Sequence, residues 1–318
     1  MCAIFLVFFF LPCFIRFDKK RVRFSLRSIS VGLLSYARTD LLIETLSNIS
    51  SDNFNIKVYL LNNNPDVCIL NEVRQYVCQG VQLEYYWFHE NLGVARGRRK
   101  LVELCTERYM ILLDDDVYIE DFDKICANVS NEFLDEKVGG IAFHILECGK
   151  NSANRYEIPH KNKEFDLDKD QDTYLMIGAG HAIDVELAMR VGNYPDDFGL
   201  YGFEEVDLSF RMLNEGFKIR YLHNCVIEHK KSPDGRFSNE LVNYLAFVNR
   251  TRMAKRYLKF RYFCTCYFVR SIFFLLKTRN FGLFVQASRE ILRSEHNHKK
   301  FGSSFYHYIR KCRGFLWY

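Results

Sequence analysis

Three consecutive carboxylates after an apolar run are the residues of this sequence best placed to do chemistry. Asp114, Asp115 and Asp116 follow residues 109–113, which predict a buried strand. Because side chains alternate along a strand, we expect Asp114 and Asp116 on one side. Two hard oxygen donors on one face suit Mg²⁺ or Mn²⁺ carrying a phosphate. The alternative is an acidic turn, since aspartate is common in turns.

Two more polar clusters lie further along the chain. Glu204 and Glu205 form one of them, and an apolar run ends at His229. Asp207 and Arg211 have helical spacing, so the sequence favours a structural ion pair between them. Carboxylates and a histidine at one place support metal binding and acid–base chemistry, so the three clusters together favour an enzyme site.

The segment from residue 28 to residue 235 alternates strand and helix patterns. Four apolar runs predict strands, at residues 28–34, 56–61, 81–88 and 109–113. A helix is predicted over residues 41–49, with Asp40 at its N-cap. Strands separated by helical crossovers predict an α/β protein with a mainly parallel sheet and ligands at the carboxyl ends of the strands. The sequence contains neither a GxGxxG fingerprint nor a P-loop.

Taken together, these residues resemble the family 2 glycosyltransferases of the GT-A fold. The resemblance covers about residues 29–229 and rests on the order and spacing of five motifs: residues 35–38, 62–64, 91–96, 114–116 and 202–211. It implies a GT-A-type mixed sheet flanked by helices. It also implies a metal-dependent, inverting transfer of a sugar from a nucleoside-diphosphate sugar to a hydroxyl acceptor.

The resemblance further implies a role for each matching residue. Asp116 would bind Mg²⁺ or Mn²⁺, with Asp114 and His229 as further ligands. Glu205 would be the general base, with Glu204 beside it in the same acidic motif. The donor nucleotide would be bound by Ser35, Tyr36, Arg38, Asn62, Asn63, Gly93, Arg96, Asp114 and Asp115.

Several alternatives remain open at this point. A nucleotidyltransferase would use similar carboxylates, but it should carry a glycine-rich basic loop where this chain has residues 35–38. A non-catalytic carbohydrate-binding or scaffold protein would keep the fold without a base. His229 alternatively only ends a strand, and His181 either points into the site or belongs to a tight turn. Residues 151–172 form either a loop over the acceptor or a solvated excursion.

The charge of the chain is divided unevenly along its 318 residues. Residues 1–27 contain 6 basic and 1 acidic residue, residues 28–235 contain 21 and 35, and residues 236–318 contain 17 and 3. These three segments are the expected N-terminal segment, GT-A catalytic domain and basic, aromatic, helical C-terminal region. A metal offsets part of the acidic charge, whereas the basic ends favour an anionic surface. Eleven scattered cysteines without a CxxC pair favour a reduced, cytosolic chain.

Both ends of the chain suggest contact with a membrane. Residues 1–15 are apolar and are followed by basic residues, which predicts a shallow anchor or a marginal span, unless the start codon is misassigned. Residues 257–279 interleave aromatic and basic residues, which predicts a helix at the membrane surface. No nucleic-acid recognition motif is present, so nucleic acid is not an expected partner. We therefore expect a saccharide or lipid-linked saccharide acceptor at the cytoplasmic membrane face, as in cell-surface polysaccharide assembly.

Overall fold

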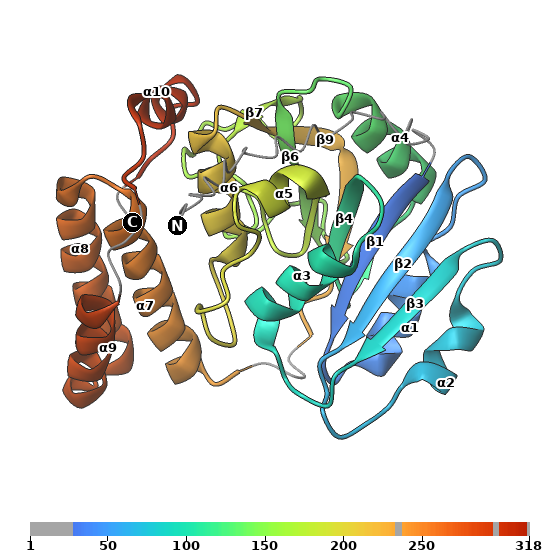
Figure 1. The fold of residues 1–318 in the computed structure, drawn as a ribbon, viewed down its shortest axis with the longest axis horizontal. Helices are drawn as coiled ribbons and strands as arrows, with labels where there is room; N and C mark the ends of the chain where they lie inside the picture. Colours follow the sequence, from blue (N-terminus) through green and yellow to red (C-terminus); the bar gives the residue numbers. More distant parts are fainter. Residues whose placement is uncertain (1–27, 233–236, 295–298, 317–318) are drawn as a thin grey trace, which may run out of the picture.

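Nine strands form one sheet. Helices pack against it (Figure 1). The computed structural model describes residues 28–232, 237–294 and 299–316, so the predicted anchor at residues 1–15 lies outside the described residues. The strands are β1 (Ser28–Ser35), β2 (Asn55–Asn62), β3 (Gln82–Trp87), β4 (Tyr109–Asp114), β5 (Val117–Tyr118), β6 (Val138–Glu147), β7 (Gln171–Thr173), β8 (Gly180–Asp184) and β9 (Lys218–His229). Their order is β3-β2-β1-β4-β8-β6-β9-β5, and β7 pairs with β9.

The first four strands form a parallel half-sheet, as the sequence predicts. β1 lies between β2 and β4, and β3 pairs with β2. In the other half, β8 is antiparallel to both β4 and β6, and β9 is parallel to β6 but antiparallel to β5 and β7. The expectation of a mainly parallel sheet therefore holds only for the first half. β8 runs antiparallel because loops, rather than helical crossovers, connect β6, β7 and β8.

Helices cover both faces of the sheet (Figure 1). On one side lie α1 (Thr39–Ser47), α2 (Leu70–Val73), η1 (Arg74–Tyr76) and α4 (Phe122–Glu132), and on the other α3 (Gly93–Leu104), α5 (Val185–Arg190) and α6 (Glu204–Asn214). Leu42 and Ile125 belong to the apolar core of the first side. Leu101 and Leu208 belong to the core of the second. The flanked α/β sheet expected from the sequence is thus confirmed.

The C-terminal region is helical, as predicted. It contains α7 (Asn239–Tyr257), α8 (Phe260–Thr278), α9 (Phe281–Arg293) and α10 (Ser303–Lys311). Phe247, Phe274 and Ile291 form a small core between α7, α8 and α9. Phe305 of α10 packs edge to face on Phe210 of α6, with ring centroids 5.2 Å apart. Within the described ranges, no helix has the length and apolar character needed to cross a bilayer.

Helix α7 also holds the loop that leads into α6. The side-chain amide of Asn249 donates hydrogen bonds to the carbonyl oxygens of Phe198 (2.7 Å), Tyr201 (3.1 Å) and Gly202 (3.1 Å). Asn249 is buried, so these bonds replace those that water would otherwise make to the three carbonyls. The C-terminal helices therefore help to place Glu204, the first residue of α6.

The start of α1 differs from the sequence prediction. The helix begins at Thr39, Arg38 occupies the N-cap position without a capping hydrogen bond, and Asp40 lies in the first turn. A guanidinium only donates hydrogen bonds, so Arg38 cannot cap the helix, and its side chain instead reaches Asp115 and Asp116 after β4. Asp40 still favours this helix end, since a negative charge in the first turn interacts well with the helix dipole.

Gly93, the first residue of α3, packs closely against the backbone at Leu200. It has φ +71°, and a β-carbon there would lie 2.6 Å from Leu200 Cα. Gly80 also has a positive φ, +85°, but a β-carbon there would meet no atom within 4 Å. We expect Gly80→Ala to cost roughly 1–2 kcal/mol from backbone strain alone. Gly93→Ala should cost more, as measured by urea denaturation, whereas equal losses would mean that Leu200 gives way without cost.

Candidate active site

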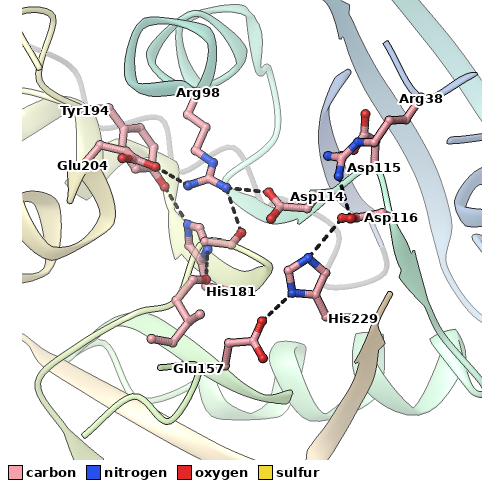
Figure 2. A network of polar contacts seen from close by, with 12 residues as sticks. Arg38, Arg98, Asp114, Asp115, Asp116, Glu157, His181, Tyr194, Glu204 and His229 are labelled. Atoms are coloured by element: carbon pink, nitrogen blue, oxygen red, sulfur yellow. Dashed lines mark hydrogen bonds and ion pairs between the residues drawn. The ribbon is translucent and has the colours of Figure 1, made fainter. Parts of the chain in front are cut away.

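The carboxyl ends of three neighbouring strands bring the predicted residues to one edge of the sheet. Ser35 of β1 pairs in register with Asn62 of β2, and Leu34 of β1 pairs with Asp114 of β4. In parallel strands these ends lie together, which is where ligands of open α/β sheets bind. Figure 2 shows the polar network that starts from this edge.

Asp116 is held by groups from three parts of the chain. Its carboxylate accepts hydrogen bonds from Arg38 Nη1 at 2.6 Å, from the Ser232 backbone amide at 3.2 Å and from His229 Nε2 at 3.1 Å. Burial raises the pKa of Asp116, but His229 and Arg38 outweigh burial and hold it below its ordinary value. Asp116 is therefore an ionised, firmly oriented carboxylate.

His229 is at the end of β9 and faces the aspartates. Its Nε2 contacts Asp116 and its Nδ1 contacts Glu157, a buried residue of the long loop after β6 (Figure 2). Burial lowers the pKa of His229, but the hydrogen bonds to Asp116 and Glu157 outweigh it and raise the pKa to about 10. Lys231 Nζ lies 2.7 Å from the other oxygen of Glu157. Residues 151–172 are therefore more than a solvated excursion, because Glu157 orients His229.

Asp115 shares the guanidinium of Arg38 with Asp116. Its carboxylate contacts Arg38, and its carbonyl oxygen accepts a hydrogen bond from the Thr45 hydroxyl at 3.1 Å. Burial raises the pKa of Asp115 to about 6, against the opposing effect of Arg38. Asp115 thus contributes to the loop that presents Asp114 and Asp116.

Asp114, Asp116 and His229 converge as a candidate metal site. One ligand atom from each residue lies within 4.8 Å of the other two. Two carboxylates and a neutral imidazole suit a divalent ion such as Mn²⁺, so the ion would displace the proton that His229 shares with Asp116. The strand alternation expected for Asp114 and Asp116 is confirmed. These three residues therefore fit the metal that the sequence predicts, and His229 does more than end a strand.

Arg98 of α3 joins this site to the start of α6. Its guanidinium contacts Glu204 Oε1 at 2.5 Å, Asp114 Oδ1 at 2.8 Å and the Gly178 carbonyl oxygen at 2.8 Å (Figure 2). Only 4% of Arg98 is exposed. A buried cation needs compensating charge, and here two carboxylates from different elements provide it.

The two glutamates of α6 have different surroundings. Glu204 is buried against Arg98, whereas Glu205 is half-buried and forms no ion pair with any described residue. Burial and the neighbouring charge of Glu204 raise the pKa of Glu205 well above its ordinary value, although Arg98 lowers it. Of the two, Glu205 is the one available to accept a proton.

Sequence reasoning missed Arg98 and Glu157. Arg98 had a detectable signal, because it lies at helical spacing from Ala95, Leu101 and Val102, which are all buried. A charged residue on an apolar helix face must find a buried partner. Glu157 had no such signal, since it lies in a loop without hydrophobic periodicity.

The predicted nucleotide-binding residues occupy two settings. Asn62 and Asn63 are buried and brace loops: Asn62 Nδ2 donates to the Val67 carbonyl at 2.7 Å, and Asn63 Nδ2 donates to the Gly93 carbonyl at 3.1 Å. Tyr36 and Arg96 are 43% exposed, and Arg96 pairs with Glu90 at 2.9 Å. Tyr36 and Arg96 are thus the two exposed residues of this set. Arg96 contacts Glu90 and is not part of the network around Arg98.

Two other sequence expectations are resolved by the contacts. Asp207 and Arg211 form the predicted ion pair, with Arg211 Nε 2.7 Å from Asp207 Oδ2. His181 is buried, and its ring nitrogens lie 2.9 Å from the Ile177 carbonyl and 2.7 Å from the Tyr194 hydroxyl. Burial and the nearby charge of Arg98 lower the pKa of His181 to about 3, so it is a neutral structural residue.

Comparison with known proteins identifies the family. The family description "Glycosyl transferase family 2" matches residues 30–192, which is half of the chain. This chain belongs to glycosyl transferase family 2. An uncharacterized protein of Haemophilus influenzae is 35% identical over 171 residues, which are 52% of this glycosyltransferase and 92% of that protein.

Solved structures share the fold of this family 2 glycosyltransferase at low sequence identity. GalNAc-T7 with UDP, GalNAc and Mn²⁺ gives a TM-score of 0.62 at 12% identity, over 90% of this chain and 56% of that chain. Staphylococcus aureus TarS 1–349 with UDP-GlcNAc gives 0.57 at 13%, over 84% and 81%. The mannosyltransferase PcManGT of Pyrobaculum calidifontis with GDP-Man and Mn²⁺ gives 0.52 at 15%, over 84% and 70%. The GT-A fold is thus confirmed, and the chain spans just over half of the GalNAc-T7 chain.

The network around Arg98 predicts a large difference between two arginines of α3. Arg98→Met should lower the free energy of unfolding by about 3–5 kcal/mol, because it leaves Glu204 and Asp114 without their cation. Arg96→Met removes only an exposed pair with Glu90 and should cost about 0–1 kcal/mol. Urea denaturation of both variants measures the difference. Similar losses for the two would contradict the role assigned to Arg98.

Proposed function

We propose that this glycosyltransferase transfers a sugar from a nucleoside-diphosphate sugar to a hydroxyl acceptor, with inversion at the anomeric carbon. The observation that carries the proposal is the network in which Arg98 connects Asp114, at the candidate metal site, to Glu204, next to Glu205. Because one guanidinium binds both Asp114 and the neighbour of Glu205, the network supports a metal ligand and a base that act on the same substrate. Structural neighbours that hold UDP or GDP-Man with Mn²⁺ support the same assignment.

The donor would lie along the carboxyl ends of β1, β2 and β4. Asp114, Asp116 and His229 would hold Mg²⁺ or Mn²⁺, which neutralises the negative charge that builds up on the leaving diphosphate. Tyr36 is partly exposed beside this edge and offers a ring for the nucleoside. Arg38 holds Asp115 and Asp116 in place and so fixes the edge on which the diphosphate rests.

Glu205 would act as the general base. It takes the proton from the acceptor hydroxyl while that oxygen forms a bond to the anomeric carbon and the bond to the diphosphate breaks. Its raised pKa makes Glu205 a stronger base than an exposed glutamate. Glu204 is neutralised by Arg98 and so serves as a positioning residue for the start of α6.

Cationic groups near Glu205 support an acceptor with a negative charge. Burial and the charges of Arg250 and Arg155 lower the pKa of Lys161 to about 8, and the nearby Glu205 opposes them. Arg250 stacks on Phe203, directly before the two glutamates, at 4.1 Å from the ring centroid. A phosphate of a lipid-linked saccharide would offset the mutual repulsion of these cations.

The outer face of α8 supports an approach to lipid. Its exposed apolar residues include Phe260 (75% exposed), Phe268 (67%) and Leu276 (70%). Basic residues such as Arg261 and Lys277 flank them, as in helices that lie in the headgroup layer. We therefore propose that the enzyme works at the cytoplasmic face of a membrane, in cell-surface polysaccharide assembly.

A thermal-shift screen tests donor and metal binding. UDP-, GDP-, dTDP- and CMP-sugars are each added with and without Mn²⁺, and one donor is expected to raise the melting temperature only with Mn²⁺. At one hundred times the dissociation constant, binding adds about 2.7 kcal/mol to stability. Asp116→Ala should abolish the shift, while the exposed control Glu136→Ala should keep it. If no donor shifts the melting temperature, a scaffold function is favoured instead.

The general base is tested by Glu205→Gln. This change keeps the shape of the side chain but removes its basicity, so turnover should fall by about 10²–10⁴-fold while donor binding persists. Because the base must be deprotonated and its pKa is raised, wild-type turnover should rise with pH through a midpoint above about 4.3, the ordinary glutamate value. Turnover and its pH profile are measured with the donor found in the screen. Retained turnover in Glu205→Gln would exclude this residue as the base.

A further inference from the structure

A large cavity lies between α6, α7, α9 and the loop after α5. Its volume is about 1100 Å³, and none of the three candidate metal ligands lines it. Six arginines contribute to its wall: Arg99, Arg211, Arg252, Arg256, Arg289 and Arg293. Four carboxylates do so as well: Asp196, Asp197, Asp207 and Glu290. The wall of the cavity therefore contains two more basic than acidic side chains.

The carboxylates are largely occupied by the buried arginines. Asp197 serves two of them, since it lies 3.5 Å from Arg252 Nη1 and 3.0 Å from Arg256 Nη1. Glu290 lies 2.5 Å from Arg252 Nη2. The buried Nε–H groups of Arg252 and Arg256 have no hydrogen-bond acceptor among the described residues. The cavity wall therefore holds more positive charge and more donors than its own carboxylates satisfy.

Of the other four arginines, Arg99 pairs with Glu103 and Arg211 pairs with Asp207, which leaves Arg289 and Arg293. Arg289 and Arg293 are exposed and lie one turn apart on α9. Neither forms an ion pair with a residue of the described ranges. Arg99 donates to the carbonyls of Gly192 (3.2 Å) and Tyr194 (2.9 Å), so backbone groups hold it in place.

We propose that this cavity is a second anion site that binds a phosphate-bearing ligand, separate from the donor site. Guanidinium groups recognise phosphate through paired hydrogen bonds, and Arg289 and Arg293 supply two at the mouth of the cavity. The volume exceeds that of most small-ligand pockets, so a group as large as a nucleotide or a lipid headgroup fits. The proposed anion site and the proposed base Glu205 share one helix. Asp207 and Arg211 of α6 line the anion site, and Glu205 lies at the start of α6.

Calorimetric titration with inorganic pyrophosphate in EDTA tests the proposal on the full chain. EDTA removes divalent ions, so binding that depends on the metal site is suppressed. Wild type and Asp116→Ala should bind pyrophosphate with equal affinity. Arg289→Ala/Arg293→Ala should bind at least tenfold more weakly, and the two arginines are exposed, so this variant should fold. The matched control Arg74→Ala/Lys169→Ala also removes two exposed charges and should bind like wild type.

Three results would overturn the site: no binding in EDTA, binding that depends on Asp116, or equal weakening in the control variant. A second arm uses vesicles that contain an anionic phospholipid. Competition between vesicles and pyrophosphate, lost in Arg289→Ala/Arg293→Ala, would identify a lipid headgroup as the source of the phosphate. Pyrophosphate binding that vesicles do not affect would support the site with a soluble phosphate compound as its ligand.

Discussion

One buried ion-pair network, centred on Arg98, sets the geometry of the rest of the site. Its guanidinium lies between Asp114, at the end of β4, and Glu204, at the start of α6. Neither carboxylate is placed by hydrophobic packing alone, because burial disfavours both charges. Since all three charges need one another, the spacing between the metal-binding edge and the base helix is fixed by electrostatics. Apolar contacts alone would fix the spacing between β4 and α6 less specifically.

The sequence predicted those parts of the site that follow regular strands. Asp114, Asp116 and His229 come directly after apolar runs, so their meeting at one sheet edge follows from topology. The insertion of β8 between β4 and β6 was not predictable, because pairing between distant strands leaves no local periodicity. Glu157 was missed because it lies in a loop, where no periodicity marks a functional residue. Roles of Ser35, Tyr36, Arg38 and the other donor-site residues remain predictions from the family resemblance.

The C-terminal helices are coupled to the site rather than appended to it. Asn249 of α7 binds three carbonyls of the loop before α6, and a left-handed residue, Phe203 with φ +73°, then turns the chain into that helix. Arg250, the next residue of α7, stacks on Phe203. The strained turn that presents Glu204 and Glu205 is thus stabilised from a segment some forty residues later in the chain.

This arrangement also explains the uneven charge of the sequence. Part of the basic charge of the C-terminal region is used inside the protein, because Arg252 and Arg256 of α7 pair with Asp197 of the acidic segment. An external anion is therefore not needed for every basic residue after residue 236. What remains without an internal partner among the described residues lies at defined places, such as Arg289 and Arg293 on α9. Net charge alone shows that a chain is basic, but only the pairing pattern shows where an anion would gain from binding.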